Sequence, residues 1–176
     1  MLRAESAAGF VSRRLREMSP PAVVPFLAPD VALVPVPRSS LQKRGALWPA
    51  FEIAQSLHAQ GFGSRVLPCL RRHTAVGKAA TASPKDRPRA RAHFDSLEVV
   101  APMDLPASVT LIDDVITRGA QMLGGAWCIW AVRPDVGVRC FAVIRTISKP
   151  EEFSTVAGPC AGHVTLGRDE ECYRAP

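Results

Sequence analysis

The chain has 176 residues, 47% of them hydrophobic, and its 22 Lys and Arg residues against 16 Asp and Glu residues give a net charge of +6. This length and apolar content suffice for one hydrophobic core and are too small for two large ones, so we expect a single domain over residues 1–176. No stretch approaches the roughly 18 uninterrupted apolar residues of a membrane-spanning helix, and we expect no membrane partner.

The N-terminal residues and the cysteines both indicate a cytoplasmic protein. Charges appear at once, at Arg3 and Glu5, and no apolar stretch with a small-residue cleavage site follows, so we expect no secretory signal. The five cysteines are odd in number, widely spaced and without a Cys-x-x-Cys pair, which favours reduced thiols over a disulfide framework.

Helical and strand patterns alternate along the chain. In chain order we expect a helix over residues 4–18, a strand over 31–36, a helix over 46–60, strands over 65–70, 94–100 and 109–112, a helix over 119–133, a strand over 138–147, and a strand or loop with a solvated acidic end over 162–176. Continuous apolar runs are typical of strands buried on both faces of a parallel sheet. The pattern predicts the α/β class, with a mostly parallel sheet flanked by helices.

One segment carries the net positive charge. Residues 65–94 hold eight Lys and Arg residues against one Asp, a net +7, and the rest of the chain, with 14 basic and 15 acidic residues, carries −1. Residues 71–93 contain few large apolar side chains and two prolines, so we expect a long basic flexible loop there. Such a loop suits a multiply charged anion, either a small polyphosphate or a nucleic-acid backbone; a solvated loop without a ligand is the alternative.

The clearest functional motif follows the strand expected at 109–112. Asp113 and Asp114 come directly after this strand, and the turn at 117–121 opens the next helix. Ligands of open α/β sheets bind at the carboxyl ends of strands, and the free N–H groups at a helix start form a pocket for phosphate. Gly119 permits close backbone approach, and the Thr117 hydroxyl can donate a further hydrogen bond. The adjacent carboxylates suit a ribose diol with Mg²⁺ nearby.

The run Leu111-Ile112-Asp113-Asp114-Val115-Ile116-Thr117-Arg118-Gly119-Ala120 resembles the signature of the phosphoribosyltransferase family, in which the turn binds the 5-phosphate of phosphoribosyl pyrophosphate (PRPP). Residues 34–38 and Lys43-Arg44-Gly45 resemble the pyrophosphate loop and the basic-glycine element of its competence protein ComF branch, where a long basic loop also separates the two motifs. The zinc ribbon with which members of the branch often begin is not in the sequence. The resemblance implies a type I phosphoribosyltransferase-like fold with a small hood of N- and C-terminal residues, and a homodimer.

The resemblance also implies a role for each matching residue. The expected catalytic residues are Asp113 and Asp114, which hold the ribose, and Arg38, which with Mg²⁺ stabilises the leaving pyrophosphate; Asp113 is associated with the metal indirectly or through PRPP. The expected PRPP-binding residues are Asp113, Asp114, Val115, Thr117, Arg118, Gly119, Ala120 and Gln121, and those of the pyrophosphate loop are Val36, Pro37, Arg38 and Ser39. Candidates in the flexible loop for closing over the pyrophosphate are Lys78, Arg87 and Arg89.

The turn departs from the family pattern at three positions. Gln121 stands where Thr or Ser is usual, Arg118 adds a charge, and Thr117 replaces the carboxylate that serves purine-base members as general base, which argues against hypoxanthine or guanine as substrate. The function we expect is transfer of the phosphoribosyl group from PRPP to an unidentified acceptor with release of pyrophosphate. Two alternatives are a non-catalytic regulator that senses PRPP or a nucleotide, and a nucleic-acid-associated, competence-type protein that uses the basic loop.

Overall fold

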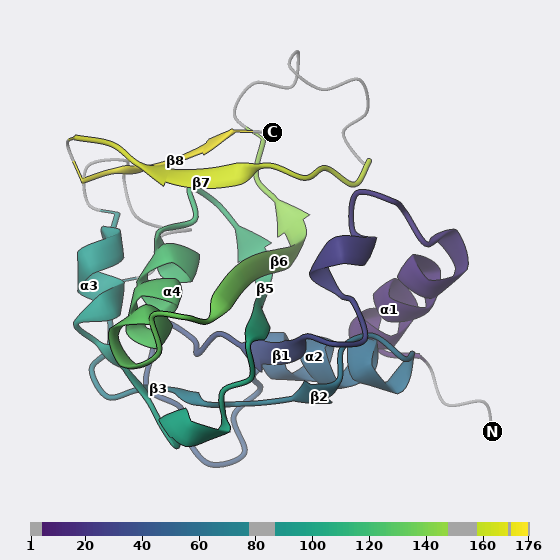
Figure 1. The fold of residues 1–176 in the computed structure, drawn as a ribbon, viewed down its shortest axis with the longest axis horizontal. Helices are drawn as coiled ribbons and strands as arrows, with labels where there is room; N and C mark the ends of the chain where they lie inside the picture. Colours follow the sequence, from purple (N-terminus) through teal and green to yellow (C-terminus); the bar gives the residue numbers. More distant parts are fainter. Residues whose placement is uncertain (1–4, 78–86, 148–157, 169, 176) are drawn as a thin grey trace.

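A computed structural model describes residues 5–77, 87–147, 158–168 and 170–175 (Figure 1). The elements in chain order are α1 (Ala7–Met18), the 3₁₀ turn η1 (Val24–Phe26), β1 (Ala32–Pro35), α2 (Pro49–Ala59), β2 (Arg65–Val66), β3 (Leu70–Arg72), α3 (Ala90–Phe94), β4 (Leu97–Val99), the 3₁₀ turn η2 (Pro102–Asp104), β5 (Ser108–Ile116), α4 (Ala120–Val132), β6 (Gly137–Arg145), β7 (His163–Leu166) and β8 (Cys172–Ala175). None of the described helices is long and apolar enough to cross a membrane.

The centre of the molecule is a four-stranded sheet in the order β2-β1-β5-β6, and all of its pairings are parallel. β1 is buried along its whole length, which accounts for the continuous apolar run in its sequence. In the register of the sheet, Pro35 lies opposite Ile112, so β1 ends beside the middle of β5, which continues to Ile116. The strand predicted over 109–112 is therefore too short, and Asp113 and Asp114 lie within β5 and not after it. The predicted α/β class, with a parallel sheet flanked by helices, is confirmed.

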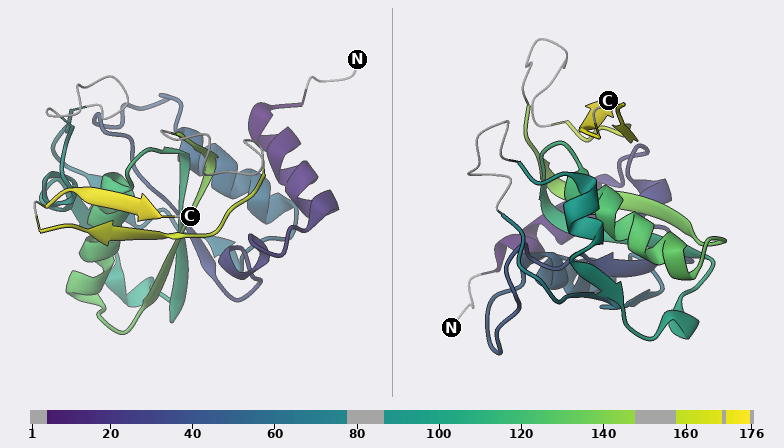
Figure 2. Two further views of the ribbon diagram at one scale, coloured as in Figure 1. Left: turned by 90° about the horizontal axis from the view of Figure 1, so that it is seen from above. Right: turned by 90° about the vertical axis from the view of Figure 1, so that its left-hand side faces the viewer.

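Helices cover both faces of this sheet, α1 and α2 on one and α3 and α4 on the other (Figures 1 and 2). Alternate residues of a strand point to opposite faces. Leu33 therefore packs with Ile53 on the α2 side, whereas Val34 packs with Ile129 on the α4 side. The two apolar clusters hold the sheet in a fixed position between the helical layers.

Local sequence signals set the starts of the first two helices. The Ser6 side chain accepts a hydrogen bond from the N–H of Gly9 at 3.1 Å and caps α1. Pro49 is the first residue of α2. A backbone N–H at this position has no partner within the helix, so proline costs no hydrogen bond there. Both helices therefore begin three residues later than the predicted ranges 4–18 and 46–60, and α2 ends one residue earlier.

The predicted loop over residues 71–93 is corrected at both ends. Arg71 and Arg72 belong to β3, which pairs antiparallel with β4, and the segment closes with α3. Arg72 is 6% exposed and His93 2% exposed, so the segment contributes to the interior. Burial, with the nearby charge of Arg72, lowers the pKa of His93 to about 4, and its ring is neutral near pH 7.

The C-terminal segment forms an antiparallel hairpin, β7–β8, which crosses above the ends of β5 and β6 (Figure 1). Arg174 ties the hairpin to these ends, because its guanidinium donates to the carbonyl of Ile116 at 3.1 Å and to the carbonyl of Thr146. The strand expected in residues 162–176 is therefore a two-stranded cover over one edge of the sheet.

Close packing of α3 on α4 depends on Gly124, and this yields a stability prediction. A Cβ at Gly124 would lie 2.6 Å from Cβ of His93 and 2.8 Å from the carbonyl oxygen of Ala90, whereas one at Gly125 would meet only side-chain methyls at 3.4 Å. Gly124→Ala should lower the unfolding free energy by about 1–3 kcal/mol. Gly125→Ala, the matched control, should leave it unchanged or higher, because alanine favours helix. Urea denaturation measures both; equal effects would contradict this account of the contact.

Candidate functional site

The strand order creates a switch point between β1 and β5, which are neighbours in the middle of the sheet. From β1 the chain runs through α2 to β2 on one side, and from β5 it runs through α4 to β6 on the other. The two connections leave in opposite directions, and open α/β sheets bind ligands at such a point, at the carboxyl ends of their strands. The N–H of Val36 donates to the carbonyl of Ile112 at 2.9 Å and fixes the residues after β1 beside β5.

Asp113 lies in β5, one residue beyond the level at which β1 ends, and is 7% exposed. Its carboxyl accepts the N–H of Asp114 at 3.0 Å and Nε2 of Gln121 at 3.1 Å. Burial raises the pKa of Asp113 well above its ordinary value, and the adjacent carboxyl of Asp114 raises it further. Asp113 therefore holds its proton more tightly than an exposed carboxyl does, and a cation or a further hydrogen-bond donor at the carboxyl would oppose this shift.

Asp114 is more accessible than Asp113. The residue is partly exposed, and its Oδ1 accepts the N–H of Val115 at 2.9 Å. The predicted pair of carboxyls thus consists of one buried and one accessible group in the C-terminal half of β5. Such a pair can hold two hydroxyl donors, or one hydroxyl and a hydrated cation.

The predicted phosphate turn leads directly into α4. Gly119 is the N-cap, with a φ of +90° that favours glycine, and no side chain caps the helix start. The first N–H groups of α4 therefore have no partner within the helix, as an anion site requires. Gln121, expected to donate to a phosphate, instead holds Asp113.

The β7–β8 hairpin covers this turn. A Cβ at Gly119 would lie 2.6 Å from a methyl of Val164, so the space assigned by sequence to a ligand is filled by the hairpin. Arg118 forms an ion pair with Glu171 of the hairpin, at 2.5 Å. The turn therefore faces the chain's own carboxylate and methyl groups.

A small cavity of about 20 Å³, room for about one water molecule, remains beside the turn. Its lining brings together residues that the sequence keeps apart: Arg87, Pro88, Arg89, Thr117, Arg118, Ala120, Glu171 and Cys172. Nε of Arg87 is buried and has no hydrogen-bond partner among the described residues. Three arginines against one glutamate give the cavity a positive charge, which favours an anion.

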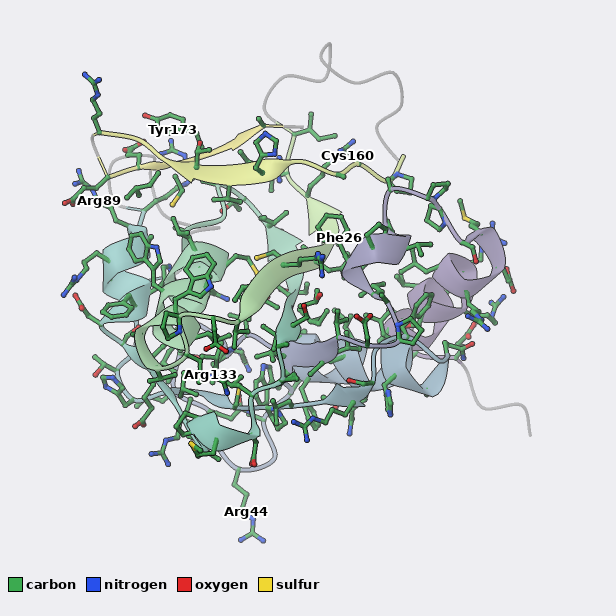
Figure 3. All side chains as sticks on the ribbon, viewed as in Figure 1. Phe26, Arg44, Arg89, Arg133, Cys160 and Tyr173 are labelled. Atoms are coloured by element: carbon green, nitrogen blue, oxygen red, sulfur yellow. The ribbon has the colours of Figure 1, made fainter. Side chains whose placement is uncertain are left out.

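Of the flexible-loop candidates, Arg87 and Arg89 do reach the turn. Arg89 lies below one end of the hairpin (Figure 3) and pairs with Glu170 at 3.3 Å. Lys78 lies outside the described residues. A larger cavity of about 450 Å³ shares Pro88 with the small one. It is also lined by residues 74–77, Ala92, Asp95 and Ser96, and its described lining contains no basic side chain.

The loop after β1 has a different arrangement from the predicted one. The carbonyl of Val36 accepts Nε1 of Trp48 at 2.9 Å, and the exposed side chain of Arg38 donates to the carbonyl of Leu47 at 2.9 Å. Arg44, in the basic-glycine element, points away from the body of the protein (Figure 3). The guanidinium of Arg38 is thus held on its own loop, and the charge beneath the loop comes from Arg72.

Arg72 is the site residue that sequence reasoning missed. Its guanidinium donates to the carbonyls of Arg38 and Pro37 from inside the molecule. The one local signal was the alternation in β3, where Leu70 and Arg72 are buried and Arg71 is exposed. A strand continued through Arg72 would have placed that side chain in the interior.

Much of the basic segment is already paired. Within the described residues, Arg71 pairs with Glu98, Arg91 with Asp95 and Arg89 with Glu170. These pairs, with the burial of Arg72, leave fewer free charges for a long phosphate backbone than the sequence indicates.

The described residues contain no group of three or more His, Cys, Asp or Glu side chains that could hold a metal ion by themselves. Asp113 and Asp114 fit Mg²⁺ in a different way. This ion prefers oxygen ligands and takes most of them from water and substrate phosphates, with one or two carboxylates from the protein. Both oxygens of Asp113 already accept hydrogen bonds, so the accessible Asp114 suits direct contact and Asp113 an indirect role.

No protein-family model matches the chain, and no curated protein matches it.

The burial of Asp113 predicts a pH-dependent effect on stability. A carboxyl with a raised pKa in the folded chain holds its proton more tightly there, so the unfolding free energy falls as the pH rises above the ordinary value of 3.8. Asp113→Asn should therefore raise the unfolding free energy at pH 7, with a gain that shrinks toward pH 4. Urea denaturation across this range measures the effect.

Asp135→Asn serves as the control of opposite sign. A hydrogen bond from Arg133 lowers the pKa of Asp135 to about 2, so this exposed carboxylate stabilises the fold above that pH. Its replacement should lower stability at pH 7. A loss of stability at pH 7 in Asp113→Asn would contradict the account of Asp113.

Proposed function

We propose that the chain binds PRPP with Mg²⁺ at the carboxyl ends of β1 and β5 and transfers its phosphoribosyl group to an unidentified acceptor, with release of pyrophosphate. The observation that carries the proposal is the placement of one buried and one accessible carboxyl between a helix start and a second loop, at the switch point of a parallel sheet. On this proposal the chain is a type I phosphoribosyltransferase of the competence protein ComF type, and the β7–β8 hairpin is its hood.

Each part of PRPP has a matching element in this proposal. The carboxyls of Asp113 and Asp114 accept the ribose hydroxyls, and the N–H groups of the turn at 117–121 bind the 5-phosphate. The loop at 36–39 binds the pyrophosphate. Transfer breaks the bond between the anomeric carbon and a pyrophosphate oxygen while the acceptor adds from the opposite face, and the chain contributes by positioning and by charge neutralisation.

Mg²⁺ would be held by Asp114, with Asp113 acting indirectly, and would neutralise charge on the pyrophosphate. Asp113 itself supplies a carboxyl whose protonation depends on its surroundings. A bound cation or ribose hydroxyl replaces the amide of Gln121 as its partner, and the freed amide can then donate to the phosphate.

To bind at the turn, the 5-phosphate has to displace the carboxylate of Glu171 from Arg118. Arg118 offers a guanidinium that can bind either Glu171 or a phosphate, because both anions present two oxygens that accept its N–H groups. Binding therefore requires a shift of Glu171 and of Val164, which fills the space next to Gly119.

A PRPP-binding regulator without transfer activity is the second candidate. The observation that favours it is Thr117, which lies in the turn at the position where purine-base members of the family carry their general base. A screen of acceptors with pyrophosphate release as the readout separates the two. Binding without release for any acceptor would favour the regulator.

Calorimetric titration with PRPP and Mg²⁺ tests the proposal. We expect micromolar binding by the unmodified chain and a loss of at least tenfold in the variant Asp113→Asn/Asp114→Asn, because the ribose hydroxyls and the cation lose their charged partners. If neither protein binds PRPP but both bind DNA or RNA in a salt-dependent way, the nucleic-acid alternative is correct and this proposal is wrong.

Glu171→Gln tests the competition at Arg118. Removing the carboxylate should tighten binding of ribose 5-phosphate by about two- to fivefold, the equivalent of the ~0.4–1 kcal/mol of a partly exposed ion pair. Glu98→Gln, which breaks a similar pair with Arg71 away from the turn, should leave the affinity unchanged. Weaker binding by Glu171→Gln would show that the pair supports the phosphate site.

A further inference from the structure

Arg72 lies directly beneath the loop that follows β1. Its guanidinium donates through Nε to the carbonyl of Arg38, through Nη1 to the hydroxyl of Ser96 and through Nη2 to the carbonyl of Pro37 at 3.5 Å. Arg72 and Ser96 are almost fully buried, so these three hydrogen bonds lie on the inner side of the loop. Two successive carbonyls of the loop are therefore turned inward.

The inward carbonyls determine where the loop's N–H groups point. The peptide bond is planar and trans, so the N–H of each peptide unit points opposite to its carbonyl; the described residues contain no cis peptide bond. The N–H groups of Arg38 and Ser39 therefore both point away from Arg72. Neither donates a hydrogen bond to an acceptor within the described residues. Successive N–H groups on one side of a loop form a concave anion site.

The charge of Arg72 has no carboxylate partner at ion-pair distance among the described residues. Asp113 interacts with it only through space. A buried guanidinium remains protonated, and an uncompensated buried charge is costly. An anion on the outer side of the loop would lower this cost, so the buried charge and the outward N–H groups favour the same ligand.

Ser96 helps to fix the orientation of the Arg72 guanidinium. Its hydroxyl accepts from Nη1 of Arg72 and donates to the carbonyl of His93 at 2.8 Å. β3 and β4 fix the two residues relative to each other, with Arg72 opposite Leu97. The guanidinium is thus oriented by packing and hydrogen bonds before any ligand is present.

We propose that Arg72 is a positioning residue, which holds the carbonyls of Pro37 and Arg38 inward so that the N–H groups of Arg38 and Ser39 bind a pyrophosphate group. Arg72 does not itself touch the ligand. This inference rests on the proposed function, because the pyrophosphate is taken to be that of PRPP. It names the residue that orients the pyrophosphate-binding loop.

The test compares Arg72→Met with Arg71→Met by calorimetry. Arg71 is the neighbouring residue of the same strand, exposed and paired with Glu98, and so is a matched control. The ligands are Mg²⁺-pyrophosphate, PRPP with Mg²⁺, and ribose 5-phosphate, which lacks the pyrophosphate. We expect Arg72→Met to weaken the first two at least tenfold and to leave ribose 5-phosphate unchanged, and Arg71→Met to change none.

Ser96→Ala is the second variant and covers the case in which Arg72→Met does not fold. It removes the support of Arg72 while keeping the charge, and should weaken pyrophosphate binding several-fold without affecting ribose 5-phosphate. Thermal unfolding and the amide NMR signals of Arg38 and Ser39 accompany each titration; we expect these two signals to shift in both variants and on pyrophosphate binding.

Four results decide the inference. Equal losses for pyrophosphate and ribose 5-phosphate would reduce Arg72 to a general structural role and overturn the proposal. Binding of PRPP by the unmodified chain with no loss in Arg72→Met or Ser96→Ala would overturn the positioning role alone. Binding of pyrophosphate but not PRPP by the unmodified chain, with the loss in the variants, would overturn the proposed function alone; binding of neither would overturn both.

Discussion

The parallel pairing of β1 with β5 is the constraint on which the site depends. Because Pro35 lies opposite Ile112, the loop that leaves β1 starts beside the part of β5 that carries Asp113 and Asp114, and the turn at 117–121 follows at the end of that strand. Each alone offers a few backbone N–H groups, a weak anion site. Together, beside the carboxyls of Asp113 and Asp114, they make a composite site, which we propose suits a ribose with phosphate groups at both ends.

Before any ligand binds, the chain satisfies this site with its own groups. Gln121 donates to Asp113, Glu171 accepts from Arg118, and Val164 fills the space at Gly119. Polar groups withdrawn from water need such partners, so their pairing stabilises the chain without ligand. Binding then exchanges internal partners for ligand atoms, and a ligand that replaces only one of them gains little. On the proposed function, this exchange gives selectivity for a ligand that carries both hydroxyls and phosphate.

Local patterns predicted the parallel sheet and its acidic turn, because buried parallel strands and helix starts have signatures within a few residues. They did not predict the roles of Arg72, Val164 and Glu171, whose partners lie far away in the chain. A lone arginine in a basic, proline-containing segment has the same local pattern whether it is solvated or buried. The position of Arg72 depends on the pairing of β3 with β4 and on Ser96, and the cover over Gly119 depends on how the C-terminal hairpin docks.

The most direct test is a crystal structure of the chain grown with Mg²⁺, ribose 5-phosphate and pyrophosphate. The account predicts a phosphate on the N–H groups of residues 117–121, with Glu171 moved from Arg118, and a pyrophosphate on the N–H groups of Arg38 and Ser39. The ribose hydroxyls should face Asp113 and Asp114. Ligands bound only in the cavity lined by residues 74–77, with the Arg118–Glu171 pair intact, would contradict it.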